Sequence, residues 1–180
     1  MLNRDGRRWL EGLGMEMLKK IGIQPGHHVL DFGCGSGFYA IPAAMLVGDE
    51  GKVIALDKNR RKLKVAAQRA WTRGLTNMDI VQTTGDLTLP FPDATMDVVL
   101  LYDVLHSDFF DDGGREQLLA EIRRVLKPEG VLSIYPRHMS RGQAITVATT
   151  AGFRLVQQLE TMLHHGHNIV TDTVFMFTLH

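Results

Sequence analysis

Three glycines at alternating positions form the part of this sequence with the clearest chemical meaning. The segment reads Asp31-Phe32-Gly33-Cys34-Gly35-Ser36-Gly37 and follows a short apolar run. Glycine permits a positive φ and lets a backbone turn come close to a ligand. A helix that begins after such a turn presents unpaired N–H groups at its start. The pattern therefore predicts a strand–turn–helix unit against a nucleotide-like ligand.

The spacing of the glycines distinguishes two kinds of nucleotide-like ligand. The dinucleotide pattern G-x-G-x-x-G would place its third glycine at position 38, where this chain has Phe38. Asp31, just before the turn, would repel a pyrophosphate but would suit a ligand that carries an ammonium and a sulfonium. A NAD-dependent oxidoreductase is therefore disfavoured. A purely structural glycine turn is the other interpretation.

Two more acids follow the next predicted strands. Asp57 ends the second strand, twenty residues beyond Gly37, where a carboxylate can hold the two hydroxyls of an adenosine ribose. Asp86 follows the third strand, where it can accept a hydrogen bond from an adenine amine while Leu87 packs on the ring. Each acid alone is weak evidence, because acids are common at strand ends and in turns. After the glycine turn, they indicate an adenosine-containing ligand.

Together these features resemble the class I S-adenosylmethionine-dependent methyltransferase superfamily, and the resemblance covers nearly the whole chain. Besides the residues above, it rests on the block 91–99 and on the block 126–132, which reads L-K-P-E-G-V-L, a pattern frequent in the family. The chain looks closest to the small-molecule branch, similar to the ubiquinone/menaquinone-type methyltransferases. It lacks the N/D-P-P-Y/F sequence associated with methylation of exocyclic amines.

The resemblance implies S-adenosylmethionine as the cofactor and a small molecule as the methyl acceptor. In the family, the acid matching Asp57 binds the ribose hydroxyls, and the acid matching Asp86 binds the adenine amine. The first turn and the backbone at 102–103 surround the methionine part. The implied cofactor-binding residues are Asp31, Gly33, Cys34, Gly35, Gly37, Asp57, Lys58, Asp86, Leu87 and Tyr102.

The acceptor is expected near residues that follow the fourth and fifth strands, because ligands of open α/β sheets bind beyond the carboxyl ends of the strands. Asp103, His106 and Arg137 are the candidate substrate-binding residues. The same argument places Ser107 and Asp108 near the reaction and makes Tyr135 and His138 further candidates.

His106 is the candidate general base, since an unperturbed imidazole has a pKa of about 6.5. Arg137 is a candidate for holding an acceptor carboxylate or phosphate. The alternatives are a packed histidine and a solvated arginine.

Hydrophobic periodicity predicts alternating strands and helices. Strands are expected at 27–32, 52–56, 78–82, 96–101 and 131–135, and helices at 38–47, 59–73, 114–126 and 140–151. This alternation is typical of a doubly wound, Rossmann-like α/β fold. The final strands, 154–160 and 168–179, leave no room for a crossover helix and should pair antiparallel. With the resemblance, we expect a seven-stranded, mostly parallel sheet with an antiparallel C-terminal strand.

The remaining segments are interpreted as follows. Residues 1–180 form a single domain, whose segment 1–24 carries a helix at 6–21 that packs on the sheet or covers the pocket. Residues 127–130 are expected to form a turn. His164, His165 and His167 are expected in a hairpin loop, and no metal site is predicted there because no acid or cysteine stands beside them.

Composition limits the class of protein. The 20 Lys and Arg balance the 20 Asp and Glu, which argues against non-specific nucleic-acid binding. The single cysteine, Cys34, excludes an internal disulfide and is interpreted as a small filler. With no evident signal peptide or membrane-spanning run, a cytoplasmic location and no membrane partner are expected. Composition leaves a monomer and a homodimer open.

The leading hypothesis is a methyltransferase with a small-molecule acceptor. A methyltransferase that acts on RNA or protein is one alternative. A non-catalytic S-adenosylmethionine-binding scaffold on the same fold is another.

Overall fold

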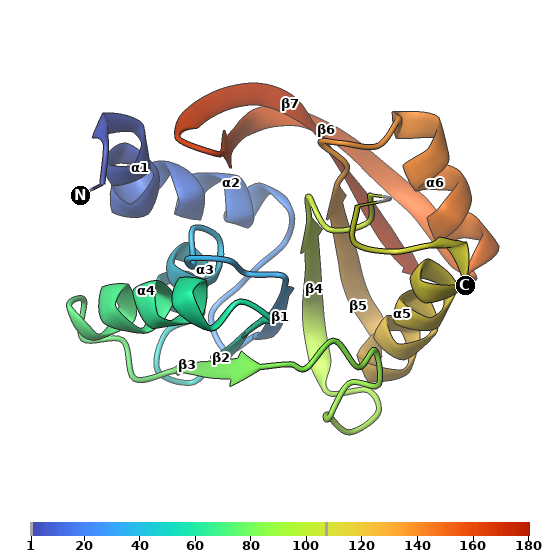
Figure 1. The fold of residues 1–180 in the computed structure, drawn as a ribbon, viewed down its shortest axis with the longest axis horizontal. Coiled ribbons are helices and arrows are strands. Elements are labelled where there is room, and N and C mark those ends of the chain that lie inside the picture. The colour runs from blue at the N-terminus through green and yellow to red at the C-terminus, as the bar shows by residue number, and fades with distance from the viewer. Residues whose placement is uncertain (1, 107) are drawn as a thin grey trace.

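The computed structural model describes residues 2–106 and 108–180, and it places them in a sheet with helices on both faces (Figure 1). The strands are β1 (His28–Phe32), β2 (Lys52–Asp57), β3 (Met78–Gln82), β4 (Met96–Tyr102), β5 (Leu126–Tyr135), β6 (Phe153–His165) and β7 (Asn168–Leu179). The helices are α1 (Arg4–Arg8), the π-helical η1 (Trp9–Leu13), α2 (Gly14–Lys20), α3 (Ala40–Val47), α4 (Arg60–Trp71), α5 (Asp112–Val125) and α6 (Arg141–Thr150).

The sheet has seven strands in the order β3-β2-β1-β4-β5-β7-β6. Strands β1 to β5 pair in parallel, and β7 runs antiparallel to both of its neighbours, β5 and β6. The central strand β4 is buried on both faces because its sequence is an almost continuous apolar run. The predicted Rossmann-like fold is confirmed.

Each face of the sheet carries its own apolar core. One core joins the N-terminal helices, α3 and Leu63 of α4 to residues such as Val29 and Leu100. The other joins α5 and α6 to residues such as Leu30 and Val99. Neighbouring strand residues therefore point into opposite cores, as the alternation of side chains along a strand requires.

Two predicted segments differ from the structure. The helix expected at 6–21 consists of α1, η1 and α2 in succession, because the backbone leaves the helical conformation at Gly12. The turn expected at 127–130 is an irregular stretch within β5. Leu126 already pairs with Met96, and regular pairing resumes at Val131 with Val98, so the residues between them bulge from the ladder.

The C-terminal hairpin is longer than the sequence predicted. Strand β6 continues to His165, so His164 and His165 lie in the strand and not in the expected loop. His164 and His165 pair with Ile169 and Asn168 of β7, and the Tyr39 hydroxyl donates to the His164 carbonyl at 2.9 Å and accepts from the His164 N–H at 3.0 Å. These bonds attach the β6–β7 hairpin to Tyr39, the residue that precedes α3 (Figure 1).

The N-terminal helices are fastened to the same region through Trp9. Its ring is fully buried, and its indole N–H donates to the Phe38 carbonyl at 2.7 Å. The Tyr39 ring meets it edge-on, with centroids 5.2 Å apart. Through Trp9, the N-terminal helices thus pack against the end of the turn that follows β1.

Among the described residues, no helix combines the length and apolar character needed to cross a bilayer.

Replacing this tryptophan should destabilise the fold. Trp9→Ala removes a large buried ring and is expected to lower the free energy of unfolding by about 3–5 kcal/mol. Trp71→Ala is the matched control, since that side chain is 75% exposed and its loss should cost less than about 0.5 kcal/mol. Denaturant titration of both variants measures the difference. Equal stabilities would contradict the packing role of Trp9.

Candidate active site

A cavity of about 560 Å³ lies at the carboxyl ends of the strands. Its walls come from the segments that follow β1, β2, β3, β4 and β5, as expected for an open α/β sheet. The sequence-predicted residues that line it are Gly33, Asp57, Lys58, Asp86, Leu87, Tyr102, Asp103 and His106. Of the described residues predicted for the site, Asp31, Cys34, Gly35, Gly37 and Arg137 do not line it.

The glycine turn is held against the end of β2. The N–H groups of Gly33 and Cys34 donate to the Leu56 carbonyl at 2.8 and 3.0 Å. Gly33 and Gly37 both have positive φ, and a Cβ on Gly33 would come within 2.7 Å of the Val104 side chain. Glycine is therefore required at position 33 both by the conformation of the turn and by the side chain opposite.

Asp57 connects this turn to the helix that follows β2. One carboxylate oxygen accepts from the Gly35 N–H at 2.8 Å, and the other accepts from the Asn59 N–H at 2.7 Å. A carboxylate has about four lone-pair positions, so two remain for hydroxyl groups in the cavity. The predicted ribose-binding acid thus has the free acceptor capacity that its role needs.

Asp31 is buried at the end of β1, and one of its carboxylate oxygens has no hydrogen-bond partner among the described residues. Burial raises the pKa of this carboxyl to about 7, against a smaller lowering by the Ala40 N–H; the nearby Asp57 raises it further. A buried acid of this kind lacks a cationic partner. The ammonium of an amino-acid moiety would supply one.

The far side of the cavity carries the predicted adenine-binding residues. The Asp86 carboxylate is exposed and accepts from the Thr88 N–H at 2.9 Å, which fixes it at the rim. Leu87 lines the wall beside it. Across the mouth, the Lys58 ammonium lies 5.0 Å from the centroid of the Phe109 ring. A cation–π contact therefore joins the segment after β2 to the segment after β4.

Phe38 has a structural role where a dinucleotide-binding turn would have glycine. Its ring stacks on His164 with centroids 3.7 Å apart, and the Arg69 guanidinium lies 4.4 Å from the ring centroid. The same guanidinium donates to the Ser36 carbonyl at 2.7 Å. Arg69 of α4 thus binds the glycine turn through Ser36, and neither of these two residues lines the cavity.

The remaining residues of the turn and of β4 act through packing. Cys34 is buried, and burial raises the pKa of its thiol far above the usual range. It is therefore unsuited to act as a thiolate. The Tyr102 hydroxyl shares a hydrogen bond of 2.9 Å with the Ser133 hydroxyl, and burial raises the pKa of this phenol.

The acceptor end of the cavity holds a group of imidazoles. His106 is almost completely buried, and its Nδ1 has no hydrogen-bond partner; the nearest carboxylate oxygen, of Asp108, is 3.7 Å away. Its ring lies 4.4 Å from that of Phe109 and 5.3 Å from that of His138. Ser107, which the sequence placed beside it, lies outside the described residues.

Arg137 is held away from the cavity lining by an ion pair. Its guanidinium donates to the Asp172 carboxylate on β7 at 3.0 Å. The chain thus supplies its own anion for this cation. A substrate-binding role for Arg137 stays a prediction.

Sequence reasoning named His138 as a further candidate but left His165 out of the site. His138 lines the cavity, and its Nδ1 lies 2.6 Å from an Asp103 oxygen. Its position three residues beyond β5 was the signal. His165 lies 3.5 Å from the second Asp103 oxygen. No sequence spacing indicates this contact, because it depends on the length of the β6–β7 hairpin.

Comparison with known proteins identifies the family. A profile described as a methyltransferase domain matches residues 29–130, more than half of the chain. The chain therefore belongs to the methyltransferase domain family. This result confirms the predicted family and, with it, S-adenosylmethionine as the cofactor. The free acceptors of Asp57 and the unpartnered oxygen of Asp31 fit the ribose hydroxyls and the ammonium of that molecule.

Particular relatives carry more specific names. The chain is 34% identical over 118 residues to the demethylmenaquinone methyltransferase of Geobacillus stearothermophilus, covering 64% of this chain and 47% of the relative. It is 37% identical over 114 residues to the ubiquinone/menaquinone biosynthesis C-methyltransferase UbiE of Teredinibacter turnerae, covering 63% and 44%. The chain thus spans about half the length of the curated relatives it matches.

Solved structures share the fold over nearly the full chain. A SAM dependent methyltransferase from Aquifex aeolicus superposes with a TM-score of 0.73 and 22% identity, covering 98% of each chain. The PH0226 protein from Pyrococcus horikoshii OT3 superposes with a TM-score of 0.75 and 19% identity, covering 99% of this chain and 92% of the other.

Removing the predicted ribose-binding acid should weaken cofactor binding. Asp57→Ala is expected to weaken S-adenosylmethionine binding by about 10- to 100-fold, since a hydrogen bond to a charged group contributes about 1.5–3 kcal/mol. Titration calorimetry measures the change. Asp79→Ala on β3, which removes an exposed carboxylate, should bind as the wild type does. A mutant at Asp57 with unchanged affinity and an intact fold would contradict the ribose role.

The buried Asp31 should make stability depend on pH. Its pKa is raised in the folded state, so the folded chain holds more protons than the unfolded chain between about pH 4 and pH 7. The free energy of unfolding should therefore fall as the pH rises through this window, by at most roughly 4 kcal/mol.

Asp31→Asn tests this dependence because its neutral amide carries no charge to desolvate. The variant should be more stable than the wild type at pH 8, and the difference should shrink toward pH 4. Denaturant titrations at the two pH values measure it, with the exposed Asp79→Asn as the control for a lost surface charge. A constant difference would show that Asp31 is not the titrating group.

Proposed function

We propose that this chain transfers a methyl group from S-adenosylmethionine to a small hydroxylated aromatic acceptor of the quinol type. The names of its relatives, demethylmenaquinone and ubiquinone/menaquinone methyltransferases, support this acceptor class. Methyl transfer to a small molecule also agrees with the balanced charge of the chain, which offers no excess of cations for a nucleic-acid backbone.

The observation that carries the proposal is the division of the cavity between two chemistries. Asp57 at the end of β2 and Asp86 after β3 line one side, whereas the segment after β4 contributes Phe109, Phe110 and His106 together with Asp103 and Asp108. The glycine turn after β1 lies between these two sets, because β1 is between β2 and β4 in the sheet. An adenosine held by Asp57 and Asp86 would direct its reactive end toward the aromatic rings and His106.

The cofactor supplies an activated methyl group, so the protein has to bind the cofactor, align the acceptor with the methyl group and remove a proton from the acceptor. Asp57 and Asp86 hold the adenosine, and Asp31 holds the ammonium. Phe109 and Phe110 give the acceptor ring an apolar surface to pack against. Alignment of this kind can contribute on the order of 7–11 kcal/mol to the lowering of the barrier.

His106 is the residue best suited to move a proton. An acceptor hydroxyl or ring carbon has to lose a proton in the reaction, and the His106 ring, which lines the cavity, can accept this proton on an imidazole nitrogen. The Asp108 carboxylate at 3.7 Å would stabilise the resulting imidazolium. The burial of the ring keeps competing water away from this proton.

Incubation with methyl-labelled cofactor tests the proposed function. We expect label from S-adenosylmethionine to appear in demethylmenaquinol, used as the probe acceptor, at least 10-fold above the level obtained with Asp57→Ala. A parallel incubation contains bulk RNA in place of the quinol. Label in RNA but not in the quinol would contradict the acceptor class, and cofactor binding without transfer to either would favour the scaffold alternative.

His106→Gln should separate chemistry from binding. Its kcat is expected to fall by about 10²- to 10⁴-fold, the usual contribution of a general base, while the affinity for S-adenosylmethionine stays unchanged. The matched control is His167→Gln at the exposed hairpin tip. Steady-state kinetics and calorimetry measure the two quantities. A kcat equal to that of the control would remove His106 as the base.

A further inference from the structure

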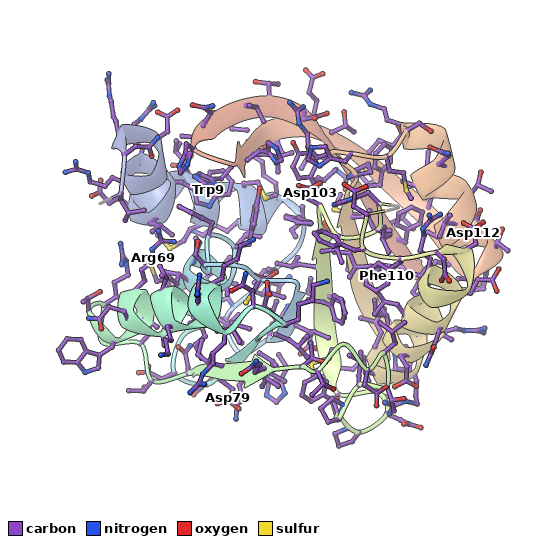
Figure 2. All side chains as sticks on the ribbon, viewed as in Figure 1. Trp9, Arg69, Asp79, Asp103, Phe110 and Asp112 are labelled. Atoms are coloured by element: carbon purple, nitrogen blue, oxygen red, sulfur yellow. The ribbon has the colours of Figure 1, made fainter. Side chains whose placement is uncertain are left out.

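Three side chains from different parts of the fold meet at the acceptor end of the cavity. Asp103 follows β4, His138 follows β5, and His165 ends β6. One ligand atom from each, two imidazole nitrogens and one carboxylate oxygen, lie within 4.8 Å of one another. Figure 2 shows Asp103 at the end of β4, beneath the β6–β7 hairpin. The convergence therefore results from the tertiary fold and not from neighbouring positions in the sequence.

We propose that Asp103, His138 and His165 form a binding site for a divalent transition-metal cation, with Zn²⁺ as the best match. Two imidazoles and one carboxylate are a donor set that suits zinc, whereas Mg²⁺ and Ca²⁺ prefer oxygen ligands. Three protein ligands also leave a position open for a further oxygen ligand. The sequence had predicted no metal here, because it suggested neither the carboxylate nor the strand position of His165.

The distances are compatible with coordination after a small movement. Ligand atoms about 2.1 Å from a tetrahedral zinc lie about 3.4 Å apart. The Nδ1 of His165 is 3.5 Å from an Asp103 oxygen and already has this spacing. The Nδ1 of His138 is 2.6 Å from the other Asp103 oxygen, so binding of zinc between these two groups would replace this contact and move the imidazole ring outward. The His138 side chain is 53% exposed and has room to do so.

The backbone of Asp103 supports a functional role for this carboxylate. Asp103 has a φ of +59°, a left-handed conformation that few residues with a side chain adopt. Its N–H donates to the Tyr135 carbonyl at 2.8 Å, which ties the end of β4 to the end of β5. This conformation thus holds the carboxylate where both imidazoles reach it.

The proposed cation would face the acceptor. Asp103 and His138 both line the cavity, so an open coordination position between them is accessible from it. If the proposed function holds, that position would take an oxygen of the hydroxylated acceptor and favour its deprotonated form. The site itself rests on the three ligands alone. Binding of metal is therefore testable without cofactor or acceptor.

Titration of the chelator-treated chain with Zn²⁺ tests the site. We expect one equivalent of Zn²⁺ to bind by calorimetry, with the affinity falling at least 10-fold in each of Asp103→Asn, His138→Gln and His165→Gln. Bound Co²⁺ should show visible absorption that is lost in the same variants. The matched control is His167→Gln, an exposed histidine two residues from His165, which should bind Zn²⁺ as the wild type does.

The outcomes separate the site from a simple ion pair. Absence of saturable Zn²⁺ binding, or equal binding by the wild type and the three variants, would overturn the proposal and leave Asp103 as a hydrogen-bond partner of His138. Circular dichroism of the metal-free variants checks folding, and should Asp103→Asn unfold, the two exposed or half-exposed histidine variants decide. S-adenosylmethionine binding by the metal-free chain is measured separately, so failure of the metal site and failure of the proposed function are distinguishable.

Discussion

The hydrogen bond from the Gly35 N–H to the Asp57 carboxylate is the contact on which the site depends. It joins the turn after β1 to the end of β2. The second oxygen of the same carboxylate accepts a hydrogen bond from the N–H of Asn59, the residue that precedes α4. A single acid thereby fixes the spacing between two strand ends and keeps acceptor capacity for a ligand. The cofactor side of the cavity is consequently held in shape by hydrogen bonds between this one carboxylate and two backbone N–H groups.

The predicted site residues that do line the cavity are those whose position follows from order along the chain. Asp57 and Asp86 follow the strands β2 and β3, and parallel strands necessarily bring their carboxyl ends to one edge. The contacts on the proposed acceptor side were harder to predict from the sequence. Arg137 follows β5 as expected, yet Asp172 of β7 binds its guanidinium, and no sequence pattern links those two positions. The contact of His165 with Asp103 requires the full length of β6, whose pairing with β7 continues beyond the predicted end of the strand.

Distant pairing and packing partners also explain the two segments, 127–130 and 6–21, for which the predicted local structure was wrong. The sequence of 127–130 has the composition of a turn, but Leu126 pairs with Met96 before it, so the ladder continues across an irregular stretch. At the N-terminus, hydrophobic periodicity found the buried face of the helices, including Trp9, but periodicity carries no information on the break at Gly12. Local conformation here follows from pairing and packing partners far away in the chain, which override local propensity.

The contact of Lys58 with the Phe109 ring has a consequence for the kinetics of ligand exchange. Both residues line the cavity, so the contact links the segment after β2 to the segment after β4, and a ligand that displaces either side chain has to break it. An exposed cation–π contact contributes about 0.5–1 kcal/mol, which corresponds to a factor of about two to five in a rate constant. Breaking this contact would therefore slow the exchange of such a ligand by no more than that factor.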